Sequence, residues 1–277
     1  MAARIGMVNY INTAPIYEIW KEQVRQPDWT VTEAPPAALN RLLAASVIDI
    51  GCVSSYEYAL RPQLYRLMAD LSISATGPVG SVFLFSSLPP EQLDQQHVLM
   101  TGQSDTSVCL LRLILEEFYQ VRPRYTHGEI CAPRSPSAEP AAVLAIGDEA
   151  LRLSNDPTRR WPLRFDLGEC WHQQTGLAFV FAVFAVREDY LDTHAEEARA
   201  IRKTLLSCRD QGLARLPEIC RLVAPRIPMS VAACQHYFHS IEYDLSPTKQ
   251  EALERFIALL AQRGEAEPTA LPLKLFA

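Results

Sequence analysis

Long hydrophobic runs are scarce in this sequence. The most apolar stretch, LAFVFAVFAV at residues 177–186, is ten residues long, whereas a helix that crosses a membrane needs about 20. A run of that length is more typical of a strand buried on both faces of a sheet. We therefore expect no membrane partner and a buried strand at this position.

Clustered basic residues are missing as well. The chain has 26 Lys and Arg against 32 Asp and Glu, a formal net charge of −6, and no basic run occurs along it. Because nucleic-acid binding requires Lys and Arg gathered opposite the phosphates, no nucleic-acid partner is expected. Apolar residues make up 48% of the 277, which is typical of a globular protein with one large or two ordinary domains.

The sequence also lacks the common motifs for nucleotides, nucleophilic serines and catalytic zinc: G-x-G-x-x-G, G-x-x-x-x-G-K-[ST], G-x-S-x-G and H-E-x-x-H. The segment CQHYFH places Cys234, His236 and His239 close together. Cys234 and His236, two residues apart, lie on different faces of a helix. A structural zinc site also needs a fourth ligand from a partner motif. From this pattern we expect no metal site.

Cysteines are few and show no pairing pattern. The seven are scattered and form no C-x-x-C pair, which favours reduced thiols in a cytosolic protein. The first expected strand begins by Arg4, which leaves no room for a secretory signal. We therefore expect a cytoplasmic protein.

Strands and helices alternate along the chain, and this order predicts an α/β fold with largely parallel sheets. The expected strands are 3–9, 47–53, 65–75, 80–87, 96–102, 140–148 and 177–187. The expected helices are 13–24, 36–45, 56–61, 105–119, 149–154, 195–211, 213–223, 230–239 and 247–262. Polar linkers are expected at 86–96, 134–140 and 154–169.

The order of these elements predicts two domains. Ninety mostly helical residues follow a sheet-rich middle, as in a chain that leaves its first domain, builds a second and returns. We expect residues 1–86 and 187–277 to form lobe I, a discontinuous α/β domain, and 87–186 to form lobe II, an inserted one. Both crossings, Ser81–Ser87 and Val180–Arg187, are apolar and extended, as expected for a buried, paired hinge.

Polar residues gather where four of the expected strands meet helices. In open α/β sheets ligands bind at the carboxyl ends of the strands, and helix N-termini there bind anions. The pattern predicts a cleft for a small, anionic, oxygen-rich molecule. The substrate-binding candidates are Tyr10, Thr13, Ser54, Ser55, Ser104, Thr106, Ser107, Gly147 and Asp148, with Asn12 beside them.

A simpler explanation exists for each cluster, because Ser, Thr, Asn and Asp are also the usual helix caps. The double cluster at 104–107 and the pair Asn9 and Asn12 exceed what one cap needs. Glu57, Asp148 and Glu149 are candidate general bases, but first-turn acids are commonly partners of the helix dipole. For Glu149 we favour the dipole role; for Asp148 both remain open.

Seven blocks of the sequence, in order over nearly the whole chain, resemble the chorismate dehydratase family, which opens the futalosine route to menaquinone. They are RIGMVNYINTAPIY, LNRLLAASVIDIGCVSSYEYAL, LMADLSISATGPVGSVFLFSS, SDTSVCLLRLIL, AIGDEAL, FDLGECWHQQTGLAFVFAVFAVR and YFHSIEYDLSPTKQEALERF. The resemblance implies a two-lobed type II periplasmic-binding-protein fold with two crossover strands and the ligand between the lobes.

The implied reaction removes water from chorismate and gives the aromatic 3-[(1-carboxyvinyl)oxy]benzoate. The site must hold two carboxylates, take one ring proton and help one hydroxide leave, and no metal or cofactor is required. No histidine lies at a junction within the blocks, so we favour a substrate-assisted route in which the enolpyruvyl carboxylate takes the proton. The catalytic candidates are Asn12, to hold the departing hydroxyl or orient the substrate, and Ser81, to contact the substrate at the first crossing.

Two alternatives remain open from the sequence. One is the sister enzyme of the same pathway, which forms dihydroxynaphthoate from a cyclic futalosine derivative. That resemblance implies a histidine at the end of the first strand, where this chain has NYINTAP. The other is a cytoplasmic protein that binds a small carboxylate without catalysis, since closing on a ligand and transforming it use the same cleft.

Overall fold

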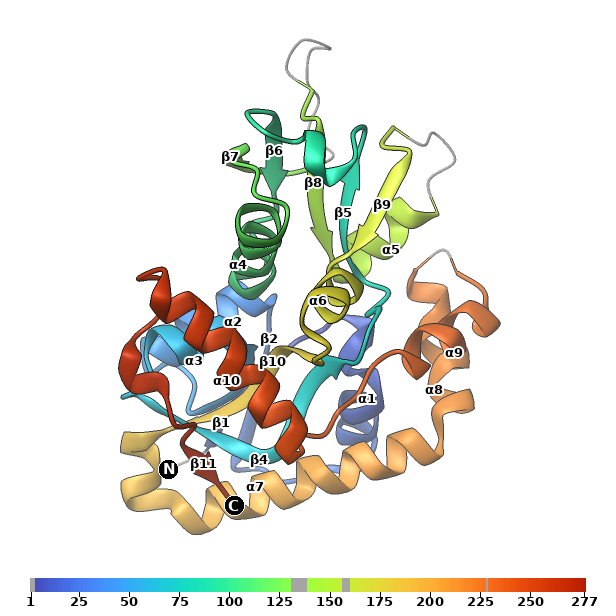
Figure 1. The fold of residues 1–277 in the computed structure, drawn as a ribbon. Coiled ribbons are helices and arrows are strands. Elements are labelled where there is room, and N and C mark those ends of the chain that lie inside the picture. Colours follow the sequence, from blue (N-terminus) through green and yellow to red (C-terminus); the bar gives the residue numbers. More distant parts are fainter. Residues whose placement is uncertain (1–2, 131–138, 156–159, 228) are drawn as a thin grey trace.

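The computed structural model describes residues 3–130, 139–155, 160–227 and 229–277. It contains two separate β-sheets, one above the other in Figure 1. The six-stranded sheet has the order β11(Leu275–Phe276), β4(Tyr65–Ala75), β10(Phe179–Arg187), β3(Ile50–Ser54), β1(Ala3–Met7), β2(Trp29–Glu33). The five-stranded sheet has the order β7(Arg124–His127), β6(His97–Met100), β8(Ala142–Ile146), β5(Val82–Ser86), β9(Leu163–Asp166). We call the part around the first sheet lobe I and the part around the second lobe II.

Helices cover both sheets. In Figure 1 the long helix α7 runs along the base of lobe I, α10 crosses its front, and lobe II stands above. The helices are α1(Ala14–Gln23), α2(Pro36–Ala44), α3(Ser55–Leu60), α4(Asp105–Leu113), α5(Gly147–Ser154), α6(Leu167–Thr175), α7(Glu188–Ala214), α8(Leu216–Val223), α9(Val231–His239) and α10(Pro247–Gln262). The helix expected at 105–119 is α4 followed by a π-helical turn at Ile114–Phe118.

The expected lobe boundaries are wrong at both crossings. Strand β5, assigned to lobe I from the sequence, pairs with β8 and β9 in the lobe II sheet. Strand β10, assigned to lobe II, lies between β3 and β4 in lobe I. Their apolar, extended character comes from burial in the middle of separate sheets and not from pairing as a hinge. The first crossing lies between Ala75 and Val82, where Gly77 and Gly80 have φ values of +93° and +75°.

The positions of β5 and β10 also explain the direction in which the other strands run. β5 and β10 are antiparallel to both of their neighbours, because each enters its lobe at the boundary and runs away from it. The strands parallel to one another, β1 with β3 and β6 with β8, point their carboxyl ends back toward the boundary. The segments that follow these strands therefore meet between the lobes.

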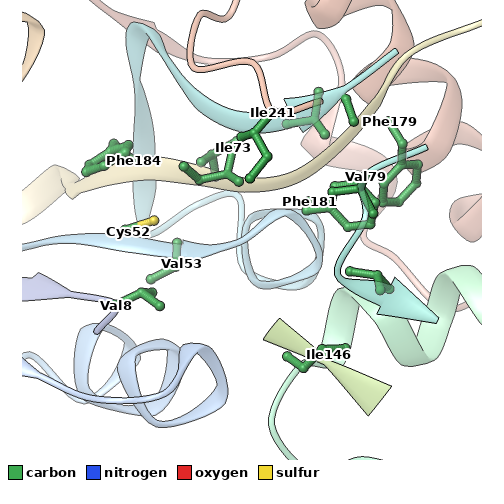
Figure 2. Packing of buried hydrophobic residues seen from close by; sticks show 14 of the residues in the cluster. Val8, Cys52, Val53, Ile73, Val79, Ile146, Phe179, Phe181, Phe184 and Ile241 are labelled. Atoms are coloured by element: carbon green, nitrogen blue, oxygen red, sulfur yellow. The ribbon is translucent and has the colours of Figure 1, made fainter. Parts of the chain in front are cut away.

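The hydrophobic core follows the two-residue period of the strands. In β5, Val82 and Leu84 belong to a core that extends through both lobes, whereas Phe83 and Phe85 pack in a smaller cluster on the other face of the lobe II sheet. Figure 2 shows part of the larger core, which includes Ile146 from lobe II and Phe181 from lobe I. The two lobes therefore share apolar surface next to their boundary.

The structure contains several strands that the sequence did not predict. The segment 154–169, expected as an irregular linker, contains β9 and the start of α6, and β2 and β7 were also not expected. Residues 156–159 of that linker and most of the expected loop at 134–140 lie outside the described residues. Within the described part of the chain, no helix combines the length and apolarity needed to cross a membrane.

Candidate active site

A cavity lies at the boundary between the lobes, where the carboxyl ends of the strands meet. Its volume is about 50 Å³, well below the roughly 300–1,000 Å³ of most small-molecule sites, so the lobes of this structure lie close together around it. Seven of the sequence-predicted residues line it: Tyr10, Asn12, Ser54, Ser81, Ser104, Ser107 and Gly147. Its other walls are Pro36, Ile73, Val79, Val82, Ile146, Phe181, Ala182 and Ile241.

Asn12 lies in a short 3₁₀ turn, Ile11–Thr13, between β1 and α1. Neither this turn nor α1 has a side-chain cap hydrogen bond, so Asn12 does not act as a helix cap. Its Oδ1 is buried and has no hydrogen-bond partner, and its main-chain oxygen accepts a bond of 2.8 Å from the hydroxyl of Tyr243. A buried acceptor without a partner costs about 1–3 kcal/mol, and a ligand in the cavity would remove this cost.

Ser54 caps α3 and also lines the cavity. Its Oγ accepts hydrogen bonds from the main-chain N–H of Glu57 at 3.4 Å and from Nδ2 of Asn40 at 2.9 Å. A hydroxyl has one proton and two lone pairs, so with both lone pairs occupied the Ser54 proton is left to donate. The same Asn40 Nδ2 reaches Oδ2 of Asp105 in lobe II at 2.9 Å, which links the lobes beside the cavity.

Lobe II contributes two further hydroxyls from the start of α4. Ser104 caps this helix by accepting from the N–H of Ser107 at 3.3 Å, and its hydroxyl donates to Oγ of Ser107 at 3.1 Å. The Ser107 proton is again left to donate. Because the dipole of α4 adds positive potential at this end, the pair suits a carboxylate.

Tyr10 and Gly147 also line the cavity and lie against each other across the lobe boundary. Gly147 has φ +55° and its N–H donates to the main-chain oxygen of Ser81 at 2.7 Å. The Tyr10 hydroxyl donates to Oε1 of Gln103 in lobe II, and burial raises the pKa of the phenol well above its usual value. Tyr10 is therefore a neutral donor that spans the lobe boundary.

Three predicted hydroxyls do not reach the cavity. Thr13 donates to the main-chain oxygen of Val8 at 2.7 Å, and Ser55 donates to that of Val180 at 2.7 Å. Thr106 Oγ1 accepts the N–H of Tyr56 at 2.9 Å across the lobe boundary. All three side chains are buried and bonded to main-chain groups. They therefore hold the local fold or the contact between the lobes, and they do not line the cavity.

The acids near the junctions are also outside the cavity lining. Asp148 Oδ1 accepts the N–H of Ile11 at 3.2 Å, another contact between lobes, and burial raises the pKa of this carboxyl. Burial likewise raises the pKa of Glu149. Burial raises the pKa of Glu57, although Tyr65 and Arg61 hold its two oxygens at 2.8 and 2.7 Å. Glu57 is thus a paired, structural acid.

Ion pairs outside the cavity lining also join the lobes. Arg263, just after α10 in lobe I, pairs with Glu116 and Glu117 in lobe II. Arg112 in lobe II pairs with Glu265 in lobe I at 3.1 Å. No group of three or more potential metal ligands occurs among residues 3–130, 139–155, 160–227 and 229–277.

The apolar wall of the cavity was not predicted as part of the site. Phe181, Ile73 and Ile241 are strongly hydrophobic, and from the sequence such residues cannot be told from core. The only available signal was position: Phe181 lies in the apolar run that became β10.

Two lobes with this strand order, joined by two crossings around a central cavity, define the class of type II periplasmic-binding-protein folds. The alkanesulfonate-binding protein from Xanthomonas axonopodis pv. citri, bound to MOPS, superposes with a TM-score of 0.66 at 14% identity, covering 96% of this chain and 94% of that one. A crystal structure of a protein from Archaeoglobus fulgidus gives 0.67 at 17% identity, covering 94% and 97%.

The chain belongs to the menaquinone biosynthesis family, whose model matches residues 3–262. The chorismate dehydratase of Thermus thermophilus is 32% identical over 269 residues, covering 92% of this chain and 94% of its own. The chorismate dehydratase of Campylobacter jejuni is 24% identical over 259 residues, covering 91% and 95%. The family and the fold expected from the sequence are confirmed.

Proposed function

We propose that this protein removes water from chorismate to give 3-[(1-carboxyvinyl)oxy]benzoate. Membership of the menaquinone biosynthesis family and the two related chorismate dehydratases support the reaction. The observation that carries the proposal to a site is the buried, unpartnered Oδ1 of Asn12 at the cavity between the lobes. An amide there can hydrogen-bond the hydroxyl that departs or orient the ring that bears it.

The lining of the cavity suits this substrate. Chorismate carries an apolar ring and two carboxylates. The side chains of Phe181, Ile73 and Ile241 offer an apolar wall, whereas the free protons of Ser54 and Ser107 lie at the N-termini of α3 and α4. Donors placed at helix N-termini can hold carboxylates even in a protein of negative net charge.

We propose a substrate-assisted removal of the proton. Among the described residues that line the cavity there is no Asp, Glu, His, Lys or Arg. In this proposal the enolpyruvyl carboxylate takes the ring proton, the hydroxyl group departs as hydroxide and combines with that proton to form water, and the ring becomes aromatic. The protein contributes position and polar stabilisation, through Asn12 and Ser81, and aromatisation drives the reaction.

We further propose that the reaction belongs to the futalosine route to menaquinone and takes place in the cytoplasm. The menaquinone family supports the first statement. The second is supported by the six cysteines in the described part of the chain, which are all buried and free, as in proteins of reducing compartments.

Incubation of the purified protein with chorismate tests the proposal. We expect one molecule of an aromatic product, lighter than chorismate by one water, for each chorismate consumed. Absorbance and mass spectrometry detect this product. Binding of chorismate without turnover would indicate a binding protein, and turnover of only a cyclic futalosine derivative would indicate the sister enzyme. Complete loss of turnover in Asp148→Asn or Glu57→Gln, with binding retained, would contradict the substrate-assisted route.

A further inference from the structure

We propose that Tyr237 is a positioning residue that fixes the Ser81 hydroxyl so that its proton points into the cavity. This inference rests on the proposed dehydration, because Ser81 is one of the two residues assigned to that reaction. Tyr237 lies on α9 and comes from a part of the sequence far from Ser81.

The contact between Tyr237 and Ser81 is direct and buried. The Tyr237 hydroxyl donates to Oγ of Ser81 at 3.0 Å, and both side chains are at least 95% buried. Burial raises the pKa of Tyr237 well above its usual value, so the phenol keeps its proton at any pH near neutrality and has one to donate.

The direction of this bond decides what Ser81 can do. A serine hydroxyl holds one proton and accepts through its lone pairs. With Tyr237 donating to one lone pair, the Ser81 proton is left for another acceptor. Ser81 lines the cavity, so a ligand oxygen there would receive it.

Hydrogen bonds hold the main chain on both sides of Ser81. The rotation of its hydroxyl group is therefore what remains to be fixed. The N–H of Gly80 donates to Oδ2 of Asp166 at 2.7 Å, and the carbonyl of Ser81 accepts the N–H of Gly147 at 2.7 Å. Tyr237 supplies the third constraint, on the hydroxyl itself.

Gly80 allows the tyrosine to come this close. It has φ +75°, and a Cβ added there would lie 3.2 Å from Cδ2 of Tyr237. The ring therefore packs against the bare α-carbon of the residue just before Ser81. Glycine is required here for two reasons: a side chain would crowd the tyrosine ring, and residues with a side chain rarely adopt this backbone conformation.

The test is a double-mutant cycle on chorismate turnover with Tyr237→Phe and Ser81→Ala. Tyr237→Phe removes one oxygen from a buried ring. We expect kcat to fall about tenfold or more while KM stays within about threefold, because the phenyl ring still fills its place. In the Ser81→Ala background the same change should have almost no further effect on kcat.

Tyr58→Phe is the matched control. Tyr58 is equally buried and donates to the main-chain oxygen of Ala270 at 3.3 Å, outside the cavity lining. It should lower the melting temperature and leave kcat unchanged. If Tyr237→Phe is unfolded at the assay temperature, the cycle is run below its melting midpoint against wild type at the same temperature.

Unchanged kcat in Tyr237→Phe, or equal loss in the wild-type and Ser81→Ala backgrounds, would overturn the inference while leaving the dehydration standing. Inactivity of the wild-type protein on chorismate would instead overturn the dehydration and this inference with it. The two failures are therefore distinguishable in one experiment.

Discussion

The ring of Tyr10 lies against the α-carbon of Gly147 across the lobe boundary, so that a Cβ added to Gly147 would come within 2.8 Å of Cδ2 of Tyr10. Real Cβ atoms do not approach so closely. Gly147 also has φ +55°, which costs other residues roughly 1–2 kcal/mol. The position of Tyr10 at the cavity therefore depends on residue 147 having no Cβ.

Gly147→Ala should therefore displace Tyr10 and lower kcat/KM for chorismate by at least about tenfold, with a loss of roughly 1–2 kcal/mol in the free energy of unfolding. Steady-state kinetics and urea denaturation measure the two effects. Gly102→Ala, where an added Cβ meets nothing within 4 Å, is the matched control. Equal activity in both variants would mean that Tyr10 does not shape the site.

The Asn40 contact between the lobes predicts a rescue by charge. Asn40→Asp places a carboxylate against Asp105, which Asn40 now reaches at 2.9 Å. Repulsion should weaken product binding by about tenfold or more. Combining Asn40→Asp with Asp105→Asn exchanges the roles, so that the new amide in lobe II can donate to the new carboxylate in lobe I. Calorimetric titration of the product should show recovery of most of the affinity in this double variant.

Asp105→Asn alone is the control for that experiment, because Nδ2 of Asn40 can donate to an amide oxygen as well. Its affinity should lie close to that of the wild type. If the double variant binds no better than Asn40→Asp, the contact does not hold the lobes together.

The sequence makes both Thr106 and Ser107 candidates for binding the substrate, but only Ser107 lines the cavity, since Thr106 Oγ1 accepts the N–H of Tyr56. Ser107→Ala should weaken product binding by about tenfold, because hydrogen bonds to charged groups contribute roughly 1.5–3 kcal/mol. Ser86→Ala, also in lobe II, removes a buried hydroxyl that donates to the main-chain oxygen of Leu88 and should leave affinity unchanged. Unaltered affinity in Ser107→Ala would make this serine part of the cap alone.

Asp148 predicts a dependence of stability on pH. Burial raises the pKa of its carboxyl in the folded chain, despite the hydrogen bond from Ile11, which lowers it. A carboxyl with a raised folded pKa favours folding most below its unfolded pKa, and this contribution is lost as the pH rises through the folded pKa. At neutral pH the charged Asp148 therefore disfavours folding.

Asp148→Asn keeps an oxygen that can accept from Ile11 and removes the charge. We expect its urea midpoint to exceed that of the wild type at pH 7 and the difference to shrink as the pH falls toward 4. The exposed Asp28→Asn is the control and should show no such trend. A constant difference across this range would contradict the assignment of the effect to Asp148.

The sequence predicted which hydroxyls line the cavity where local chemistry determines their position. Ser54 and Ser104 follow buried strands and start helices, and strand direction then brings them together. The sequence did not predict the direction of side chains whose partners lie in other parts of the fold. The hydroxyls of Thr13 and Ser55 donate to main-chain oxygens and do not reach the cavity. No local signal distinguishes these cases.

The lobe boundaries failed for a related reason. An apolar run such as β10 has the same composition whether it links two domains or lies in the centre of a sheet, and pairing with β3 and β4 decides the matter. Likewise, β9 reads LRFD, with charged residues and a proline just before it. Its pairing with β5 outweighs its weak local tendency to form a strand.

The most direct test of the account is the turnover of chorismate by Asn12→Asp. This change keeps the size of the side chain but removes two N–H donors and adds a negative charge beside a dianion. We predict a normal melting curve and a loss of at least about a hundredfold in kcat/KM, roughly 2.7 kcal/mol of transition-state stabilisation. Asn9→Asp, the same change at an exposed position three residues away, should keep full activity. Near-native turnover by Asn12→Asp would contradict the claim that chorismate loses water at this cavity.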